Sequence, residues 1–272
     1  MKKPAFDHLL ITRFNVAWPD GPNQGLDPGW LEARFQLFER FCLPSVRAQS
    51  CSNFRWLILM DERTPAEYRN RIEAHARWEN LHPVYLRRPL TVLDDGFLDV
   101  VRAHARPDVR YLITTRLDND DAIARHFIQA IQEAFRGVKR EVLEFPCGYV
   151  WNEHKLYRVP HYPSNPFSSL IEERDEFTTV YGDTHESLAK SAPVRVLARR
   201  PSWIQVVHGG NIANRVRGVR CRLSAQALGR DFALDIGDGA PTESILAYAA
   251  DYASRWRDVL ADFKRGLRRA GR

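Results

Sequence analysis

The sequence predicts an α/β fold, in which a mainly parallel sheet has helices on both faces and a smaller antiparallel part follows. Three observations carry this prediction. The 272-residue chain is 44% hydrophobic, which is enough for a sizeable core. Apolar runs alternate with helical patterns through the N-terminal half, an order typical of right-handed crossovers between parallel strands. Polar clusters follow directly after these apolar runs, where ligands bind in such sheets.

The N-terminal half contains four short apolar runs that read as strands, at residues 8–14, 54–60, 84–86 and 109–115. Asp27 is placed to cap a first helix whose inner face continues to Phe41 or Cys42, and Pro44 predicts a kink there. Thr64-Pro65-Ala66-Glu67 reads as a capping box opening a helix to about Trp78. Further helices are expected at 97–105 and after Asp121, the last with Ile123, Phe127, Ile128, Ile131 and Phe135 facing inward.

The C-terminal half has a different character. Residues 142–150 and 156–159 predict a hairpin that turns at Asn152-Glu153-His154. Residues 160–166 look irregular, and 202–207 look like a late strand. A long helix is expected to open at Thr242-Glu243-Ser244 and to dock an apolar stripe on the domain, formed by Ile245, Ala249, Tyr252, Trp256, Val259, Phe263 and Leu267.

No linker separates the halves, so we expect one domain over residues 1–272. Its parts are an N-terminal half (1–136), a second half (137–240) and a C-terminal helix (241–272). Apolar runs are too short to span a bilayer and no export signal is recognisable, which favours a cytoplasmic location. The four cysteines form no CxxC pair and are expected to be reduced thiols. The net charge of +6 favours anionic partners.

Asp118, Asp120 and Asp121 are the sharpest chemical feature. Three carboxylates within four residues repel one another, and a divalent cation would relieve that repulsion. Mg²⁺ or Mn²⁺ suits such oxygen ligands, especially when substrate phosphates complete the shell. An EF-hand loop is excluded, because its sixth and twelfth positions would be Ile123 and Gln129. The alternative is that these acids only cap the following helix.

The stretch 116–121 (RLDNDD) resembles the DXD segment of GT-A glycosyltransferases, a Rossmann-related fold. Residues 41–49 and 54–61 match their first helix and second strand. More closely, the chain resembles a bacterial rhamnosyltransferase family over about residues 8–215. This second resemblance is carried by the stretches 12–14 (TRF), 43–45 (LPS), 56–59 (WLIL), 115–121 (TRLDNDD) and 208–211 (HGGN).

The resemblance implies that residues 1–136 are the nucleotide-binding half and residues 137–240 the acceptor-side half. It also implies a metal site and a donor-nucleotide site. Asp118 and Asp120 would hold a metal–diphosphate unit, and Asp121 would support the loop or the sugar. His208 would be the third metal ligand, with His185 as its competitor. The residues expected at the donor nucleotide are Thr12, Arg13, Phe14, Asp61, Arg116 and Asp118, with Arg13 and Arg116 suited to phosphate.

An inverting transfer also needs a base for the acceptor hydroxyl. The candidates are Glu172, Glu173 and Asp183, with Glu172 favoured because residues 165–172 resemble the family's acceptor side. The implied activity is metal-dependent transfer of a sugar, with rhamnose as a candidate, from a nucleotide-sugar donor to a glycan or lipid-linked acceptor. Three aromatic residues on the expected hairpin could stack on sugar rings, and the alternative is that they pack in the core. They are Tyr149, Trp151 and Tyr157.

Basic residues in the C-terminal helix would allow peripheral contact with the inner face of a membrane, and no nucleic acid is expected as a partner. They are Arg255, Arg257, Lys264, Arg265, Arg268 and Arg269. Two other classes remain open. One is a Mg²⁺-dependent phosphatase or nuclease. Phosphatases with an aspartate nucleophile place their DxD after the first strand, whereas Asp118 follows a fourth strand. The other is a non-catalytic basic domain that binds nucleic acid or glycan, which would not need three carboxylates on one loop.

Overall fold

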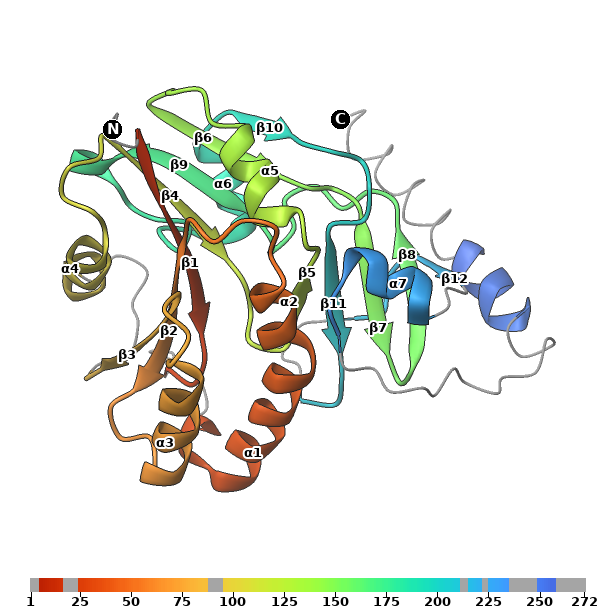
Figure 1. The fold of residues 1–272 in the computed structure, drawn as a ribbon. Coiled ribbons are helices and arrows are strands. Elements are labelled where there is room, and N and C mark those ends of the chain that lie inside the picture. The colour runs from red at the N-terminus through yellow and green to blue at the C-terminus, as the bar shows by residue number, and fades with distance from the viewer. Residues whose placement is uncertain are drawn as a thin grey trace.

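The computed structural model describes residues 5–16, 24–87, 95–210, 215–221, 225–234 and 249–257. Two sheets, of seven and five strands, organise the described part of the chain (Figure 1). The mainly parallel α/β architecture expected from the sequence is confirmed, and a second sheet occupies the C-terminal half.

The larger sheet has the strand order β10-β6-β9-β4-β1-β2-β3. The strands β4, β1, β2 and β3 run parallel, whereas β9 is antiparallel to both β4 and β6. Since β4, β1 and β2 are adjacent and parallel, their carboxyl ends meet at one edge, as the sequence indicated. The strand bounds are β1 Phe6–Arg13, β2 Arg55–Asp61, β3 Leu81–Leu86, β4 Tyr111–Arg116, β6 Arg140–Glu144, β9 Ser169–Glu173 and β10 Val194–Val196.

Helices cover both faces of this sheet because apolar side chains alternate along its central strands. Leu10, Trp56 and Ile58 face one side and pack with α1, α3 and α5, whereas Leu9 and Leu57 face the other and pack with α4 and α6. The helix bounds are α1 Pro28–Leu37, α2 Leu43–Arg47, α3 Ala66–His75, α4 Asp95–His104, α5 Phe127–Glu133, α6 His185–Ser191 and α7 Ala225–Asp231, with short 3₁₀ turns η1 Gln24–Leu26 and η3 Arg174–Glu176.

A π-helical turn, η2 (Phe38–Cys42), joins α1 to α2 where the sequence predicted a kink. Pro44 lacks an N–H and would leave an α-helical carbonyl without its donor. The chain widens instead, and the Leu43 N–H bonds to the carbonyl of Phe38, five residues back. Asp27 caps α1 as predicted, accepting from the N–H of Trp30 at 2.8 Å.

The second sheet has the order β12-β8-β7-β11-β5 and leans against the end of the first (Figure 1). The antiparallel pair β7–β8 is the predicted hairpin, and its turn residues Glu153 and His154 adopt positive φ angles of 47° and 62°. Strand β11 lies between β7 and β5 and brings the end of residues 203–207 toward the loop after β4. The bounds are β5 Ala122–Ile123, β7 Gly148–Asn152, β8 Lys155–Val159, β11 Trp203–Val207 and β12 Val219–Cys221.

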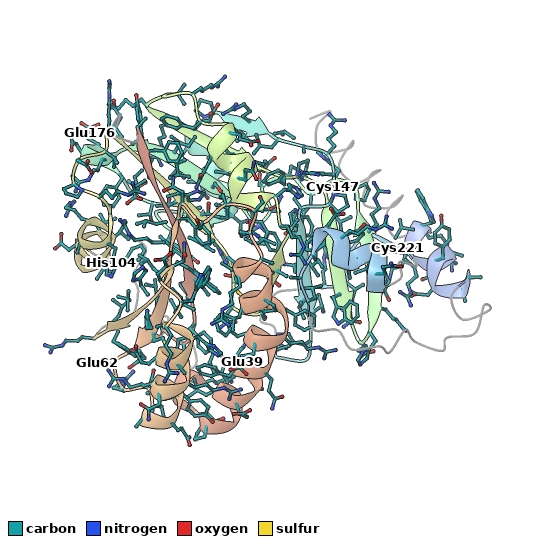
Figure 2. The ribbon with its side chains drawn as sticks, viewed as in Figure 1. Glu39, Glu62, His104, Cys147, Glu176 and Cys221 are labelled. Atoms are coloured by element: carbon teal, nitrogen blue, oxygen red, sulfur yellow. The ribbon has the colours of Figure 1, made fainter. Side chains whose placement is uncertain are left out.

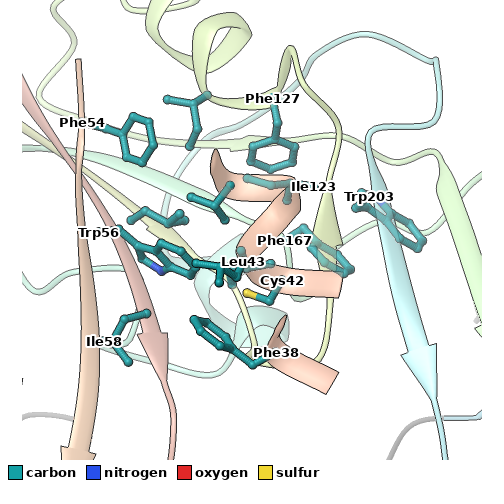
Figure 3. Close-up of a cluster of buried hydrophobic side chains, with 14 of the residues drawn as sticks. Phe38, Cys42, Leu43, Phe54, Trp56, Ile58, Ile123, Phe127, Phe167 and Trp203 are labelled. Atoms are coloured by element: carbon teal, nitrogen blue, oxygen red, sulfur yellow. The ribbon is translucent and has the colours of Figure 1, made fainter. Parts of the chain in front are cut away.

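Aromatic side chains fill the space between α1–η2–α2, the large sheet and β11 (Figure 3). Phe167 stacks on Trp203 with ring centroids 4.9 Å apart and planes 8° apart. Cys42 is buried in the same cluster, and none of the four cysteines forms a disulfide. Cys147 and Cys221 lie among the elements of the second sheet (Figure 2). The described cysteines are therefore thiols.

Three secondary-structure expectations drawn from the sequence need correction. The run 142–150 is not one strand: Pro146 has no N–H for a ladder, and the chain passes there from β6 in one sheet to β7 in the other. The helix expected to include Ile123 begins only at Phe127, because Ile123 pairs with Trp203 in β5. Thr64 caps no helix; its hydroxyl donates to the carbonyl of Asp61 at 2.6 Å.

The C-terminal helix is described only over 249–257; the remainder of the expected helix, 242–248 and 258–272, lies outside the described residues. In this stretch the apolar positions do not dock. Tyr252 and Trp256 are 39% and 42% exposed. Asp251 faces the domain instead and accepts a hydrogen bond from the hydroxyl of Tyr157 at 3.0 Å. Within the described residues, no helix combines the length and apolar character needed to cross a membrane.

Candidate functional site

The acidic loop that follows β4 is fastened to the end of β1 by backbone and amide hydrogen bonds. The N–H of Leu117 donates to the carbonyl of Ile11 at 3.1 Å, and the Asn119 amide donates to the carbonyl of Phe14 at 2.8 Å. Asn119 is 5% exposed, so this amide is a fixed part of the loop. The carboxylates on either side of it are therefore held beside the carboxyl end of β1.

Ser45 in α2 and Gln49, two residues after that helix, hold the other end of the loop. The N–H of Ile123 donates to Ser45 Oγ at 3.3 Å. Gln49 donates to the carbonyl of Ala124 at 2.9 Å and accepts from the N–H of Ile128 at 3.0 Å. These contacts give a structural reason for Ser45 and Gln49 in the stretch that resembles glycosyltransferases.

Asp120 lies between Arg34 and His208, which are far apart in the sequence. Its Oδ2 accepts from Arg34 Nη1 at 2.6 Å and lies 2.9 Å from His208 Nε2. Arg34, in the last turn of α1, also donates through Nη2 to the carbonyl of Gly210 at 3.1 Å. The Gly210 N–H donates to His208 Nδ1 at 3.1 Å, so Nε2 carries the proton that points at Asp120.

Asp118 belongs to a second cluster, with two arginines around Tyr181. Both oxygens of Asp118 contact Arg116, the closest pair at 3.1 Å. The guanidinium carbons of Arg13 and Arg116 lie 4.9 and 5.5 Å from the centre of the Tyr181 ring. Arg13 ends β1 and Arg116 ends β4, so the cluster sits on neighbouring strand ends. His185 follows in α6, with Nδ1 2.5 Å from the carbonyl of Ser164.

Electrostatics keeps this second cluster charged. Burial opposes ionisation of Asp118, but the charges of Arg116 and Arg13 outweigh it and lower the pKa of the carboxyl. Burial likewise opposes the charge of Arg116, yet Asp118 raises the pKa of its guanidinium. Burial lowers the pKa of Arg13, which nevertheless stays cationic at neutral pH. Two cations face one anion, leaving net positive charge for an anionic ligand.

Asp121 has a structural place, distinct from those of its two acidic neighbours. It is 1% exposed and accepts from the Val206 N–H at 2.8 Å, which ties the loop to β11. Burial, followed by the charges of Asp120 and Asp118, raises its pKa well above the usual range. Asp121 therefore holds the loop together.

Three residues expected at the donor nucleotide have other partners. Thr12 is fully buried and accepts from Trp56 Nε1 at 2.9 Å. Phe14 is 4% exposed and packs on Phe35 with ring centroids 4.5 Å apart. The Asp61 carboxylate is bound by Arg63, at 2.7 and 3.0 Å, which lowers the pKa of Asp61. Thr12 and Phe14 are core residues, which corrects the expectation that they meet a nucleotide.

The candidate bases lie in two different places. In the antiparallel pairing of β4 with β9, Glu173 faces Tyr111 and Glu172 faces Leu112, at the end of β4 opposite to Asp118. Glu172 is 2% exposed, pairs with Arg140 at 2.6 Å and accepts from the N–H of Thr179. This placement does not suit the expected role of Glu172 or Glu173 as a base. Asp183 is exposed and lies two residues after Tyr181.

The three aromatic residues of the β7–β8 hairpin are packing residues in the first instance. Trp151 is 9% exposed and lies 6.1 Å from the ring of Phe41, and Tyr157 is 3% exposed. Tyr149 is half-buried and packs on Phe232 after α7, at 6.1 Å. Core packing, the alternative to sugar stacking, accounts for their environment.

The residues around Asp120 fit a divalent cation as a two-residue site. A carboxylate and an imidazole are suitable ligands for Mn²⁺ or Mg²⁺. His208 can bind a cation through Nε2 only when its ring proton moves to Nδ1, which gives up the contact with the Gly210 N–H. Two ligands at about 2.1 Å on adjacent octahedral positions are about 3 Å apart, and Asp120 Oδ2 and His208 Nε2 are 2.9 Å apart. Among the residues that the structure describes, no third acidic, cysteine or histidine side chain joins them to form a cluster of three. Substrate oxygens would have to complete such a shell.

Sequence reasoning missed two residues that shape the site, Arg34 and Tyr181. Arg34 lies on a helix whose charged residues look like a solvated face, and its contact with Asp120 joins positions 86 residues apart. Tyr181 follows a polar stretch with no periodicity. Only its place between Arg13 and Arg116 reveals it, and no local pattern encodes that.

Residues 24–220 match the model of a family described as "Putative rhamnosyl transferase". The match covers well over half of the chain, so the chain belongs to that family. Comparison with curated proteins gives no match.

Solved structures similar to this chain have low identity. The crystal structure of S. aureus TarS 1–349 matches with a TM-score of 0.42 and 10% identity over 74% of this chain and 60% of TarS. The crystal structure of TarS 1–349 in complex with UDP matches with a TM-score of 0.43 and 10% identity over 75% of this chain and 61% of TarS. The 4-diphosphocytidyl-2C-methyl-D-erythritol synthase of Anaerococcus prevotii matches with a TM-score of 0.40 and 12% identity over 71% of this chain and 88% of the synthase. The chain thus spans about three fifths of the TarS 1–349 chains.

Proposed function

We propose that this chain is a divalent-cation-dependent glycosyltransferase that moves a sugar from a nucleotide-sugar donor to a glycan or lipid-linked acceptor with inversion. One observation carries the proposal: Arg13, Arg116 and Asp118, and beside them Asp120 and His208, gather at the carboxyl ends of β1 and β4. The family's description supports rhamnose as the donor sugar.

The chemistry follows from the charge that develops when the sugar–phosphate bond breaks. The leaving group is a nucleoside diphosphate, and Arg13 and Arg116 are fixed donors for its phosphate oxygens. Their position is set by Tyr181, whose hydroxyl donates to the carbonyl of Ile11 at 3.2 Å. Asp118 keeps Arg116 oriented at the edge of the sheet.

Asp120 and His208 are the residues that would hold Mn²⁺ or Mg²⁺. When bound, the cation neutralises charge on the diphosphate. For proton removal from the acceptor hydroxyl we favour Asp183 over Glu172 and Glu173, because its carboxylate is exposed and its chain position is adjacent to Tyr181.

Thermal unfolding with UDP, dTDP, GDP and CDP, each with and without Mn²⁺, tests the proposal. A ligand at a hundredfold excess over its Kd stabilises the fold by about 2.7 kcal/mol. We expect a cation-dependent shift with one nucleotide, lost in Asp120→Asn. Glu176→Gln, an exposed change at the opposite end of β4, is the matched control and keeps the shift. Equal unfolding temperatures with every nucleotide would refute the donor site.

A peripheral position at the inner face of a membrane is the second part of the proposal. The exposed aromatic pair Tyr252 and Trp256, with ring centroids 6.3 Å apart, lies beside Arg257. Such aromatic and basic residues favour an anionic lipid interface. Sedimentation with anionic vesicles, comparing the full chain with Trp256→Ser and a chain lacking residues 264–272, tests this. Unchanged sedimentation of both variants would remove the membrane contact and leave the donor site untouched.

A further inference from the structure

Arg34 forms a close ion pair with Asp120, and the proposed function gives this arginine no task. Its Nη1 lies 2.6 Å from Asp120 Oδ2, the same oxygen that faces His208. The side chains of Arg34 and Asp120 are 12% and 5% exposed, so solvent screens the pair only weakly. A cation that bound Asp120 and His208 together would share this oxygen with the guanidinium.

Arg34 is also held in place by more than Asp120. Its Nη2 donates to the carbonyl of Gly210, and its guanidinium carbon lies 5.0 Å from the centre of the Trp30 ring. A weaker contact joins Nη1 to Asn119 Oδ1 at 3.4 Å. The Arg34 side chain therefore joins the acidic loop to the loop after β11.

We propose that Arg34 is the resident counter-cation of Asp120 and competes with the divalent cation for that carboxylate. A guanidinium and a divalent cation on one carboxylate oxygen repel each other, so the cation alone binds weakly. The negative charge of a nucleoside diphosphate attracts both and removes that penalty, so cation and nucleotide bind cooperatively. This inference rests on the proposed function, since it takes Asp120 as a ligand of the cation.

Binding of Mn²⁺ alone, measured by the loss of the free-ion signal in electron paramagnetic resonance, tests the competition without any turnover. We expect Arg34→Gln to bind Mn²⁺ about tenfold more tightly than the wild type, a change of about 1.4 kcal/mol. Arg34→Lys keeps a cation at this position and should stay near the wild type. The gain in Arg34→Gln should disappear when Asp120→Asn is added.

Arg71→Gln is the matched control. Arg71 is a half-buried arginine that pairs with Glu32 and Glu39, at 2.8 and 2.6 Å, on the same side of the sheet. Its loss changes the net charge equally but removes no partner of Asp120, so Mn²⁺ affinity should not change. A second measurement serves if Arg34→Gln folds poorly. In the wild type, saturating UDP should raise Mn²⁺ affinity by about tenfold or more, after the Mn²⁺ bound by UDP alone is subtracted.

Equal or weaker Mn²⁺ binding in folded Arg34→Gln would overturn the proposal, as would an increase of the same size in Arg71→Gln. Absence of Asp120-dependent Mn²⁺ binding in every variant would overturn it as well. The proposed function is judged separately, by the nucleotide-induced shift in unfolding temperature of the same proteins. If nucleotide still raises the unfolding temperature but Mn²⁺ affinity is the same in the wild type and Arg34→Gln, only the competition between Arg34 and the cation is rejected.

Discussion

The stability of this protein should fall steeply below neutral pH because His8 is buried as a neutral base at the centre of the large sheet. Its side chain is fully buried on β1. Gln132 donates to Nδ1 at 3.3 Å, which leaves the proton on Nε2 to donate to Thr115 Oγ1 at 2.8 Å. Burial lowers the pKa of His8 to about 3.

The magnitude follows from proton linkage. An unfolded chain binds a proton at this histidine below about pH 6.5, whereas the folded chain does so only near pH 3. His8 therefore contributes stability that is fully present above pH 6.5 and is lost as the pH falls toward 3. Each pH unit in this window costs about 1.4 kcal/mol, about 2 kcal/mol by pH 5 and about 5 kcal/mol in all.

Urea unfolding at pH 7, 6 and 5 measures this loss. His8→Gln removes the titrating group, so its stability should fall less between pH 7 and 5, by about 2 kcal/mol. His161→Gln, a change at an exposed histidine, should retain the steep wild-type dependence. Parallel pH profiles for the wild type and His8→Gln would show that His8 is not held neutral by burial, and the reasoning would fail.

Three further outcomes follow from the structure. A Cβ built on Gly148 would overlap the indole ring of Trp203. Gly148→Ala should therefore lower the free energy of unfolding by about 3 kcal/mol, and with it the unfolding temperature. Gly229 has open space around it, so Gly229→Ala should leave the unfolding temperature unreduced. Arg116→Gln should weaken nucleoside diphosphate binding about tenfold by calorimetry, and unchanged affinity would exclude its phosphate contact. Asp183→Asn should lower kcat at least about a hundredfold with little change in the donor KM; wild-type kcat would dismiss it as the base.

The parts of the fold that were predictable are those encoded by local apolar patterns. The strands β1, β2 and β4 were predicted within a few residues, because each is a continuous buried run that stops at a polar residue. Of the second sheet, the sequence predicts the β7–β8 hairpin and the strand at 202–207 but not the pairing that joins them, because that pairing is non-local. β5 has two residues, and β11 joins it to β7 across more than fifty residues of chain.

The site was predictable only as far as neighbouring strand ends allow. Arg13, Arg116 and Asp118 could be grouped because parallel β1 and β4 end at one edge. Glu172 was misjudged because the direction of β9 cannot be read from its sequence. An antiparallel β9 carries that residue away from the acidic loop, whereas a parallel one would carry it toward the loop.

The acidic loop shows why a sequence argument from charge repulsion was incomplete. From the sequence, three carboxylates with no visible partners seemed to need one shared cation. In the fold they have separate partners: Asp118 pairs with Arg116, Asp120 lies between Arg34 and His208, and Asp121 accepts from the backbone of β11. The motif therefore combines an arginine-orienting carboxylate, a candidate cation ligand and a structural tether. Since Arg116 and Arg34 already offset part of this repulsion, the negative charge of the substrate becomes the larger reason for the site to take a cation.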